Sequence, residues 1–213
     1  MKSTLHASTL VVLLALAVAP MSRALAVEST NQAQEVRAKI DSVRTEVAKV
    51  RNQVALTLEE LNRLRNDNIE LRTQFQVYSQ ELGRMEEQAN VARERAVNMG
   101  QKGQAYFQGW EDTIKTISNE DIREQAQKRY NKRLSSYNEI IEAMTAARDE
   151  LKPFMSDLND IKTMLDSELS RESVKSASNL IKQANWHGAK VVDSLKDVEK
   201  ELDRVSGELA KYE

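Results

Sequence analysis

Apolar side chains recur at alternating spacings of three and four residues through the first half of the chain. The repeat occupies Val36, Ile40, Val43, Val47, Val50, Val54, Thr57, Leu61, Leu64, Asn68, Leu71, Phe75, Tyr78, Leu82, Met85, Ala89, Ala92, Ala96 and Met99. Only Thr57 and Asn68 among these positions are polar. This heptad period is typical of a helix that packs along another helix, and it excludes strands, which alternate with a period of two.

A second repeat of the same kind lies near the C-terminus. It occupies Val174, Ala177, Ile181, Ala184, Gly188, Val191, Leu195, Val198, Leu202, Val205, Leu209 and Tyr212. Between the two repeats, residues 122–169 also follow a helical period, with a broader apolar face that indicates burial from two sides. We therefore predict an all-α fold, in which long antiparallel helices form an elongated four-helix bundle or coiled coil.

Three short polar stretches divide these helical patterns, at residues 66–68, 118–121 and 169–173. Their Ser, Asn and Asp side chains can accept hydrogen bonds from the free amides that begin a helix. The predicted helices are therefore about 31–65, 68–117, 121–168 and 172–211. Pro153 lies inside the third of them, and because it lacks a backbone N–H we expect a kink there.

The stretch Asn66-Asp67-Asn68 leaves two arrangements open. An asparagine at a heptad core position can set the register of a parallel coiled coil, which would allow one continuous rod from Asn31 to Ile117. All three residues are nevertheless weak helix formers whose side chains favour local bonds to the backbone. We favour the turn, in which the chain is mostly its own partner.

The first residues have the parts of a secretory signal peptide: Lys2, an apolar run at 10–19, and the small-residue cleavage pattern Ala24-Leu25-Ala26. The run is shorter than the roughly 20 residues that a membrane-spanning helix needs. We predict that residues 1–26 are removed, leaving 27–213 as one helical domain, soluble in the periplasm without stable membrane insertion. The chain has no cysteine, so we expect neither disulfides nor a lipoprotein anchor.

The charge balance argues against nucleic acid as a partner. The chain has 31 basic and 33 acidic residues. The predicted cleavage removes Lys2 and Arg23, so 29 basic residues remain against 33 acidic ones, a net charge of −4. Both signs are interspersed, which is typical of a solvated surface and not of a basic nucleic-acid-binding patch.

The residues that usually carry chemistry are scarce. His187 is the only histidine after the predicted cleavage, and without cysteine the chain lacks a ligand set for a transition metal. No nucleophile motif accompanies His187, and Gly100, Gly103 and Gly109 do not form a phosphate-binding loop. We therefore predict no catalytic, cofactor-binding or metal-binding residues and a non-enzymatic protein.

Two aromatic groups remain. Phe107, Trp110 and Ile114 share one helix face and predict a structural plug at the end of the bundle. Gly188 lies on the inner face of the last predicted helix, with Trp186 roughly opposite. Either a further helix covers Trp186, which is the arrangement we favour, or Trp186 and His187 form an interaction surface.

The order of several motifs after Leu71 carries a resemblance. These motifs are Phe107-x-x-Trp110-x-x-x-Ile114, Ile122-Arg123, Tyr137-x-x-Ile140 with Met144, Leu151-x-Pro153-Phe154 before Asp157, and Ile161-Lys162 leading to Leu165. In this order they resemble the bacterial domain-of-unknown-function family 2959. The resemblance implies an exported, all-helical protein with a first hairpin near Asn66, and it brings no established activity. The family's Lys-His-Asn-Leu-Asn-Ala segment is replaced here by residues 162–167, which lack the histidine.

These patterns predict a scaffold or adaptor of the bacterial envelope that acts through protein–protein contacts. Its partner would be another envelope protein or a second copy of the chain. The alternative is a periplasmic coiled-coil holdase chaperone, which should expose apolar side chains at the tips of its helices. The tip candidates near Asn66 and Ser170 are polar, which favours the adaptor.

Overall fold

The computed structural model describes residues 19–210, with side chains described from residue 31 onward. The predicted signal peptide therefore lies largely outside the described residues. The helices are α1 (Ala19–Arg63), α2 (Leu71–Lys115), α3 (Glu120–Ser167), α4 (Arg171–Ser176) and α5 (Ser178–Ala210). The described range contains no strand, so the prediction of an all-α helical bundle is confirmed.

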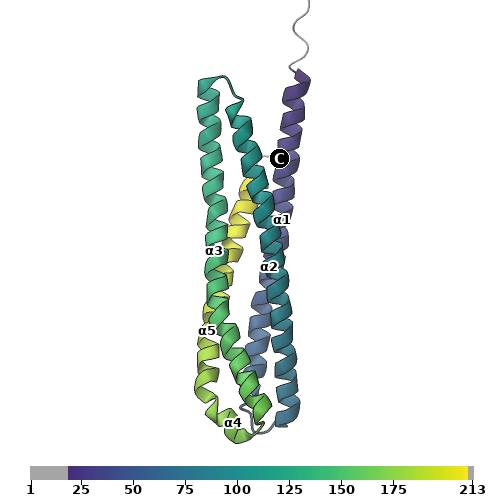
Figure 1. The fold of residues 1–213 in the computed structure, drawn as a ribbon, viewed down its shortest axis with the longest axis vertical. Coiled ribbons are helices and arrows are strands. Elements are labelled where there is room, and N and C mark those ends of the chain that lie inside the picture. The colour runs from purple at the N-terminus through teal and green to yellow at the C-terminus, as the bar shows by residue number, and fades with distance from the viewer. Residues whose placement is uncertain (1–18, 211–213) are drawn as a thin grey trace, which may run out of the picture.

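The long helices pack as an elongated bundle in which α1–α2, α2–α3, α3–α5 and α1–α5 are neighbours (Figure 1). Residue numbers fall along one helix of each pair as they rise along the other. The contacts that establish this order are Gln53–Glu81 and Glu60–Gln74 for α1–α2, Tyr78–Leu158 and Tyr137–Met99 for α2–α3, Gln183–Asp157 and Arg204–Ser136 for α3–α5, and Asp41–Ser206 and Asn62–Asn185 for α1–α5. Neighbouring long helices thus run in opposite directions.

The turn at Asn66-Asp67-Asn68 lies between α1 and α2, so the chain folds back there. The Asn66 side chain accepts a hydrogen bond from the backbone N–H of Asn68 at 3.0 Å, which is the local bonding that favours turns. The guanidinium of Arg171, at the start of α4, donates to the backbone carbonyls of Leu64 and Asn66, each at 3.1 Å, and to that of Ile69. The turn between α1 and α2 is therefore hydrogen-bonded to the start of α4.

Side-chain caps begin the later helices. The Glu70 carboxylate accepts from the backbone N–H of Arg72 at 2.9 Å at the start of α2. Asn119 and Ser170 cap α3 and α4 in the same way. Each cap satisfies amides that have no partner within the first turn of a helix.

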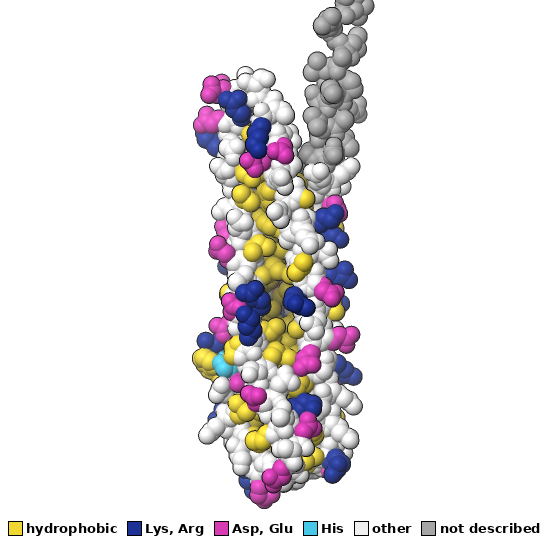
Figure 2. Space-filling model, in the orientation of Figure 1, with side chains coloured by type: hydrophobic (Ala, Val, Ile, Leu, Met, Phe, Trp, Pro, Cys, Tyr) yellow, Lys and Arg dark blue, Asp and Glu magenta, His cyan; other side chains and the backbone are white. Residues whose placement is uncertain are grey.

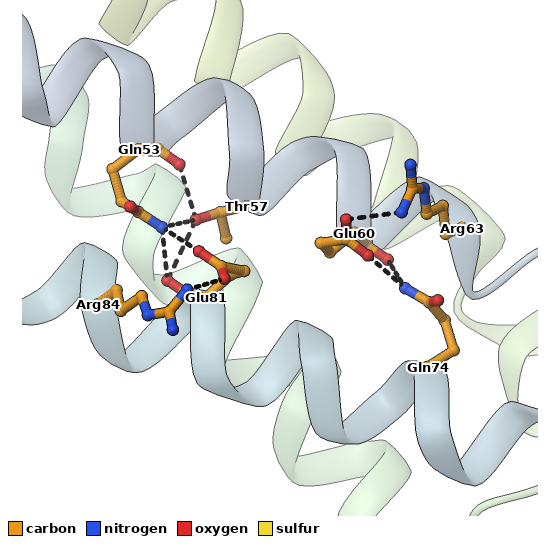
Figure 3. A network of polar contacts seen from close by, with 7 residues as sticks. All are labelled: Gln53, Thr57, Glu60, Arg63, Gln74, Glu81 and Arg84. Atoms are coloured by element: carbon orange, nitrogen blue, oxygen red, sulfur yellow. Dashed lines mark hydrogen bonds and ion pairs between the residues drawn. The ribbon is translucent and has the colours of Figure 1, made fainter.

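A buried polar cluster joins α1 to α2 (Figure 3). The Gln53 amide donates to the Glu81 carboxylate at 2.7 Å and to the Glu81 backbone carbonyl at 3.1 Å. The Thr57 hydroxyl, fully buried, lies beside them and donates to the Gln53 carbonyl at 2.8 Å. One turn or more of sliding between α1 and α2 would leave these buried groups without partners, so the cluster fixes the register of the hairpin.

Most of the largest fully buried side chains lie towards the α4 end of the bundle. These include Tyr78, Phe154, Leu158, Ile161 and Leu165. Gly188 of α5 is buried, and a Cβ atom at that position would lie 2.6 Å from Leu58 and 3.0 Å from Phe154. The absence of a side chain at Gly188 therefore lets α1, α3 and α5 approach one another closely.

Pro153 lies within α3, as the sequence places it, and the helix continues past it. Figure 1 shows α3 changing direction in the green part of the helix that contains this residue. The missing N–H of proline removes one intrahelical hydrogen bond, which is the usual cause of such a bend.

Candidate functional site

The interface between α2 and α3 is closed at two levels by tyrosine hydroxyls. Tyr78 of α2 donates to the backbone carbonyl of Leu158 at 2.7 Å, and Tyr137 of α3 donates to that of Met99 at 2.8 Å. Burial disfavours the charged phenolate, so it raises the pKa of Tyr137 to about 12 and also raises the pKa of Tyr78. Both hydroxyls therefore stay protonated and able to donate at neutral pH.

Between these two levels α2 presents Ala89, Ala92 and Ala96 towards α3, and a groove of about 440 Å³ opens there. We call this the α2–α3 groove. Its floor consists of buried residues of α1 and α5, namely Val43, Val47, Val50, Val191, Leu195 and Val198. The α3 wall carries Ile141, Met144, Ala147 and Leu151. Because a methyl group is too short to span the interface, the alanines leave the core partly uncovered.

Figure 2 shows a band of hydrophobic side chains along one face of the molecule, and the groove occupies part of this face. Val97 at its edge is 55% exposed, and Ile141 is 37% exposed. Soluble proteins seldom expose a contiguous apolar surface of this kind unless it binds something. The groove combines an almost entirely aliphatic lining with exposed edges, and it is our candidate functional site.

The only ionisable residues that line the groove are Arg93 on the α2 wall and Arg148 on the α3 wall. Arg148 is paired with the neighbouring Asp149, at 3.1 Å between Nη2 and Oδ1. Among the side chains that the structure describes, Arg93 has no ion-pair partner. The ionisable groups on the groove walls are therefore both basic, Arg148 being partly neutralised by Asp149, although the chain as a whole is slightly acidic.

The aromatic residues predicted from the sequence lie at the far end of the α2–α3 interface. Phe107 and Ile114 are buried, and Trp110 is partly buried. Trp110 contacts Tyr130 with ring centroids 5.6 Å apart, and the Arg133 guanidinium lies 5.4 Å from the indole centroid. These rings hold α2 against α3 in the part of the bundle beyond the end of α5 (Figure 1).

Trp186 and His187 lie elsewhere, on α5. The expectation that a further helix covers Trp186 is wrong: the side chain is 56% exposed, with the Lys190 ammonium 4.1 Å from its ring centroid. α5 packs against α1 and α3 through its other face, and the indole contacts Lys190 and His187 of α5 itself. The alternative, in which Trp186 and His187 form an interaction surface, stays a prediction.

His187 contacts a buried acid, Asp157, which the sequence analysis named only as part of a family motif and without a role. Its Nδ1 lies 2.6 Å from Oδ2 of Asp157, whose other oxygen accepts from Gln183 at 3.1 Å. A His–Asp pair can activate a nucleophile when a hydroxyl or thiol meets the imidazole. No serine or threonine hydroxyl bonds to His187 among the described side chains. The pair joins α3 to α5.

Neither a metal site nor a membrane-spanning helix is evident in the part of the chain that the structure describes. No three His, Asp or Glu side chains there are grouped so that they could hold a metal ion. Within residues 19–210, no helix combines the length and the hydropathy needed to cross a membrane.

Comparison with known sequences places the chain in a family. Residues 33–207 match the model of a family described as "Protein of unknown function (DUF2959)". The match includes residues 33–63 of α1, which precede the region where the motifs show their resemblance. Searches of curated proteins and of solved structures found no significant match. Because the match covers most of the chain and nearly all of the described bundle, the protein belongs to the DUF2959 family.

Proposed function

We propose that this protein is a non-enzymatic adaptor of the bacterial envelope that binds another protein through the α2–α3 groove. The observation that supports this proposal is the groove itself: an apolar, partly exposed surface along the side of the bundle. Interaction sites on helical proteins commonly take an apolar segment of a partner into such a groove.

The proposed location rests on the sequence. Lys2, the apolar run at 10–19 and Ala24-Leu25-Ala26 favour export and cleavage, which would release the bundle into the periplasm. Sequencing the N-terminus of the protein from cells should give Val27 as the first residue. Full-length protein in the membrane fraction would contradict this.

A binding role fits the groove better than a catalytic one. Its floor and walls are almost entirely aliphatic, and its two arginines have no acid, imidazole or hydroxyl nucleophile opposite them apart from Thr145. An active site needs several polar groups that converge on the reacting atoms. The groove offers instead a surface that gains free energy when apolar side chains cover it.

The experiment is site-specific photo-crosslinking in cells. A photoreactive phenylalanine analogue at Val97, on the edge of the groove, should capture a discrete protein. The matched control is the same analogue at Leu56, which is 48% exposed on α1 and does not line the groove. Combining the Val97 probe with Ala92→Phe, which fills the groove, should abolish the product. Equal products at both positions, or a product insensitive to Ala92→Phe, would contradict the proposal.

The holdase alternative receives less support from the geometry. Asn66, Asp67 and Asn68 at the turn between α1 and α2 are exposed and polar, which disfavours binding of an unfolded client at this turn. A holdase would give a broad range of crosslinked proteins from Val97, whereas an adaptor would give one or a few.

A further inference from the structure

The shape of the α2–α3 groove limits the length of what can fill it. The α2 wall extends from Ala89 to Val97 and the α3 wall from Ile141 to Leu151. At 1.5 Å per residue these walls are about 12 and 15 Å long, or two to three helical turns. A helix that places apolar residues at positions i, i+3 or i+4, and i+7 covers about 11 Å on one face, which matches the groove.

The α2 wall also has a surface shape that allows another helix to pack closely against it. Ala89, Ala92 and Ala96 are spaced by three and four residues, so their small side chains form a shallow ridge along the helix axis. Ridges of this spacing fit the grooves of another helix, and alanines let its side chains reach the floor. A docked helix would supply the covering that larger residues give elsewhere in the bundle.

The two arginines define the charge of the occupant. Arg93 and Arg148 lie on opposite walls. In the antiparallel pairing set by Tyr78 with Leu158 and Met99 with Tyr137, Arg148 lies opposite residue 88, so the two arginines are about 7 Å apart along the groove, on either side of its middle. Figure 2 shows Lys or Arg side chains on both sides of the apolar band at mid height. Since no acid lines the groove, an occupant with carboxylates on both flanks of its apolar stripe is complementary to it.

The same charges disfavour other occupants. A second copy docked groove to groove would bring four arginines together, which is repulsive. The predicted leader carries Lys2 and Arg23 and no acid, so it lacks the complementary charge. A lipid with one headgroup would place its charge at one end of the acyl chain, whereas these cations flank the middle of the groove.

We infer that the partner of the α2–α3 groove is an amphipathic helix of another protein, with an apolar stripe of about two turns and acidic residues on both of its flanks. This inference rests on the proposed function and specifies the chemistry of the partner.

The test uses two designed helical peptides with the same leucine stripe, one flanked by glutamates and the other by lysines. Binding to the chain comprising residues 27–213 is measured by fluorescence anisotropy at low salt. The glutamate peptide should bind at least about tenfold more tightly than the lysine peptide. The double variant Arg93→Glu and Arg148→Glu should reverse this preference, and Ala92→Phe should abolish binding of both peptides.

Arg95→Glu is the matched control, because Arg95 is an exposed arginine of α2 that does not line the groove. It makes the charge change of one of the two groove substitutions and should leave the preference for glutamate intact. Circular dichroism spectra would establish that each variant is folded. An equal affinity for both peptides, or a preference that Arg93→Glu with Arg148→Glu leaves unchanged, would overturn the inference.

Two further measurements address the other occupants. Concentration-dependent dimerisation that Ala92→Phe removes, seen by sedimentation, would overturn the inference in favour of a second copy. Binding of a fluorescent fatty acid that Ala92→Phe removes, without a preference for the glutamate peptide, would overturn it in favour of lipid. A discrete crosslink from Val97 without the peptide preference would reject only the acidic helix, whereas loss of that crosslink would reject the proposed function.

Discussion

The same two helices, α2 and α3, meet in a closed region around Tyr78 and in an open region around Ala92. In the closed region Tyr78 is fully buried, and its hydroxyl reaches the backbone of α3. In the open region Ala92 is only partly buried, and the valines of α1 and α5 form the floor of a groove. Both regions continue one heptad repeat, so the period is the same while the side-chain volume differs.

The difference teaches that a heptad pattern determines which face of a helix turns inward, but not whether the opposite helix is near enough to cover it. Large residues at Tyr78 and Tyr137 close the interface at two levels. The intervening alanines lie between fixed points, so α2 and α3 cannot simply collapse onto each other. The groove is therefore built into the packing of the bundle.

The strongest test of this comparison is a pair of core substitutions. Phe154→Ala, in the closed region, should lower the free energy of unfolding by about 3–5 kcal/mol because it leaves a cavity. Ala92→Leu, in the open region, adds volume where there is space and should change that free energy by less than about 1 kcal/mol. Urea denaturation measures both. A large loss from Ala92→Leu would mean that the open region is already packed.

Replacing either of two glycines of α2 by alanine should give the next largest change in stability, and the two changes should have opposite signs. A Cβ atom at Gly103 would lie 2.2 Å from the ring of Tyr137, whereas one at Gly100 would meet nothing within 4 Å. Gly103→Ala should therefore destabilise the protein by about 1–3 kcal/mol through overpacking. Gly100→Ala should stabilise it by about 0.5–1 kcal/mol, because alanine favours the helix. Thermal unfolding of both variants should show shifts in opposite directions.

The hydroxyl of Tyr137 predicts a smaller, pH-dependent effect. Tyr137→Phe should cost about 1 kcal/mol at neutral pH, the typical net value of one hydrogen bond. Burial raises the pKa of Tyr137 from 10.0 to about 12, so the folded state holds this proton more tightly than the unfolded state. The stability that this provides is complete below pH 10 and is lost as the pH rises through about 12.

The measurement is the free energy of unfolding of the wild type and of Tyr137→Phe between pH 8 and pH 12. The wild type should lose stability more steeply above pH 10 than the variant does. Parallel curves would show that the Tyr137 hydroxyl does not distinguish the folded from the unfolded state.

The smallest effect is expected where an aromatic ring lies outside the core. Trp186→Ala should change the free energy of unfolding by less than about 1 kcal/mol, since the side chain is mostly exposed. Phe107→Ala is the buried control and should cost about 3–5 kcal/mol. Trp110 is only partly buried, so its removal should fall between these values. A Trp186 variant that unfolds readily would show that another surface covers this indole.

Much of the fold could be predicted from the sequence, because helix period, caps and turn formers are local signals. Asn66-Asp67-Asn68 lies in a turn, and Asn119 and Ser170 cap helices within the predicted breaks. The polar cluster of Gln53 and Glu81 was missed because neither residue lies on the heptad repeat. Thr57, a polar residue on that repeat, was the one available signal.

The candidate site was harder to predict. Ala89, Ala92 and Ala96 count as apolar in a periodicity analysis in the same way as leucines, so the sequence pattern suggested that they are covered. Their opening depends on the distance between α2 and α3, which is set by Tyr78 and Tyr137 many residues away. A run of three small residues between Met85 and Met99 was a usable signal. The contact of His187 with Asp157 could not be predicted from the periodicity, because it joins residues of two different helices.

Arg171 disfavours the exchange of α1 between two copies of the chain. Two copies could form every α1–α2 contact by exchanging α1, with residues 64–70 continuing as one helix between them. The backbone carbonyls of Leu64, Asn66 and Ile69 would then accept hydrogen bonds within that helix. The guanidinium of Arg171 would lose these three acceptors, to which it donates in the folded chain. Domain exchange therefore carries a free-energy penalty at this residue, which favours each chain folding on itself.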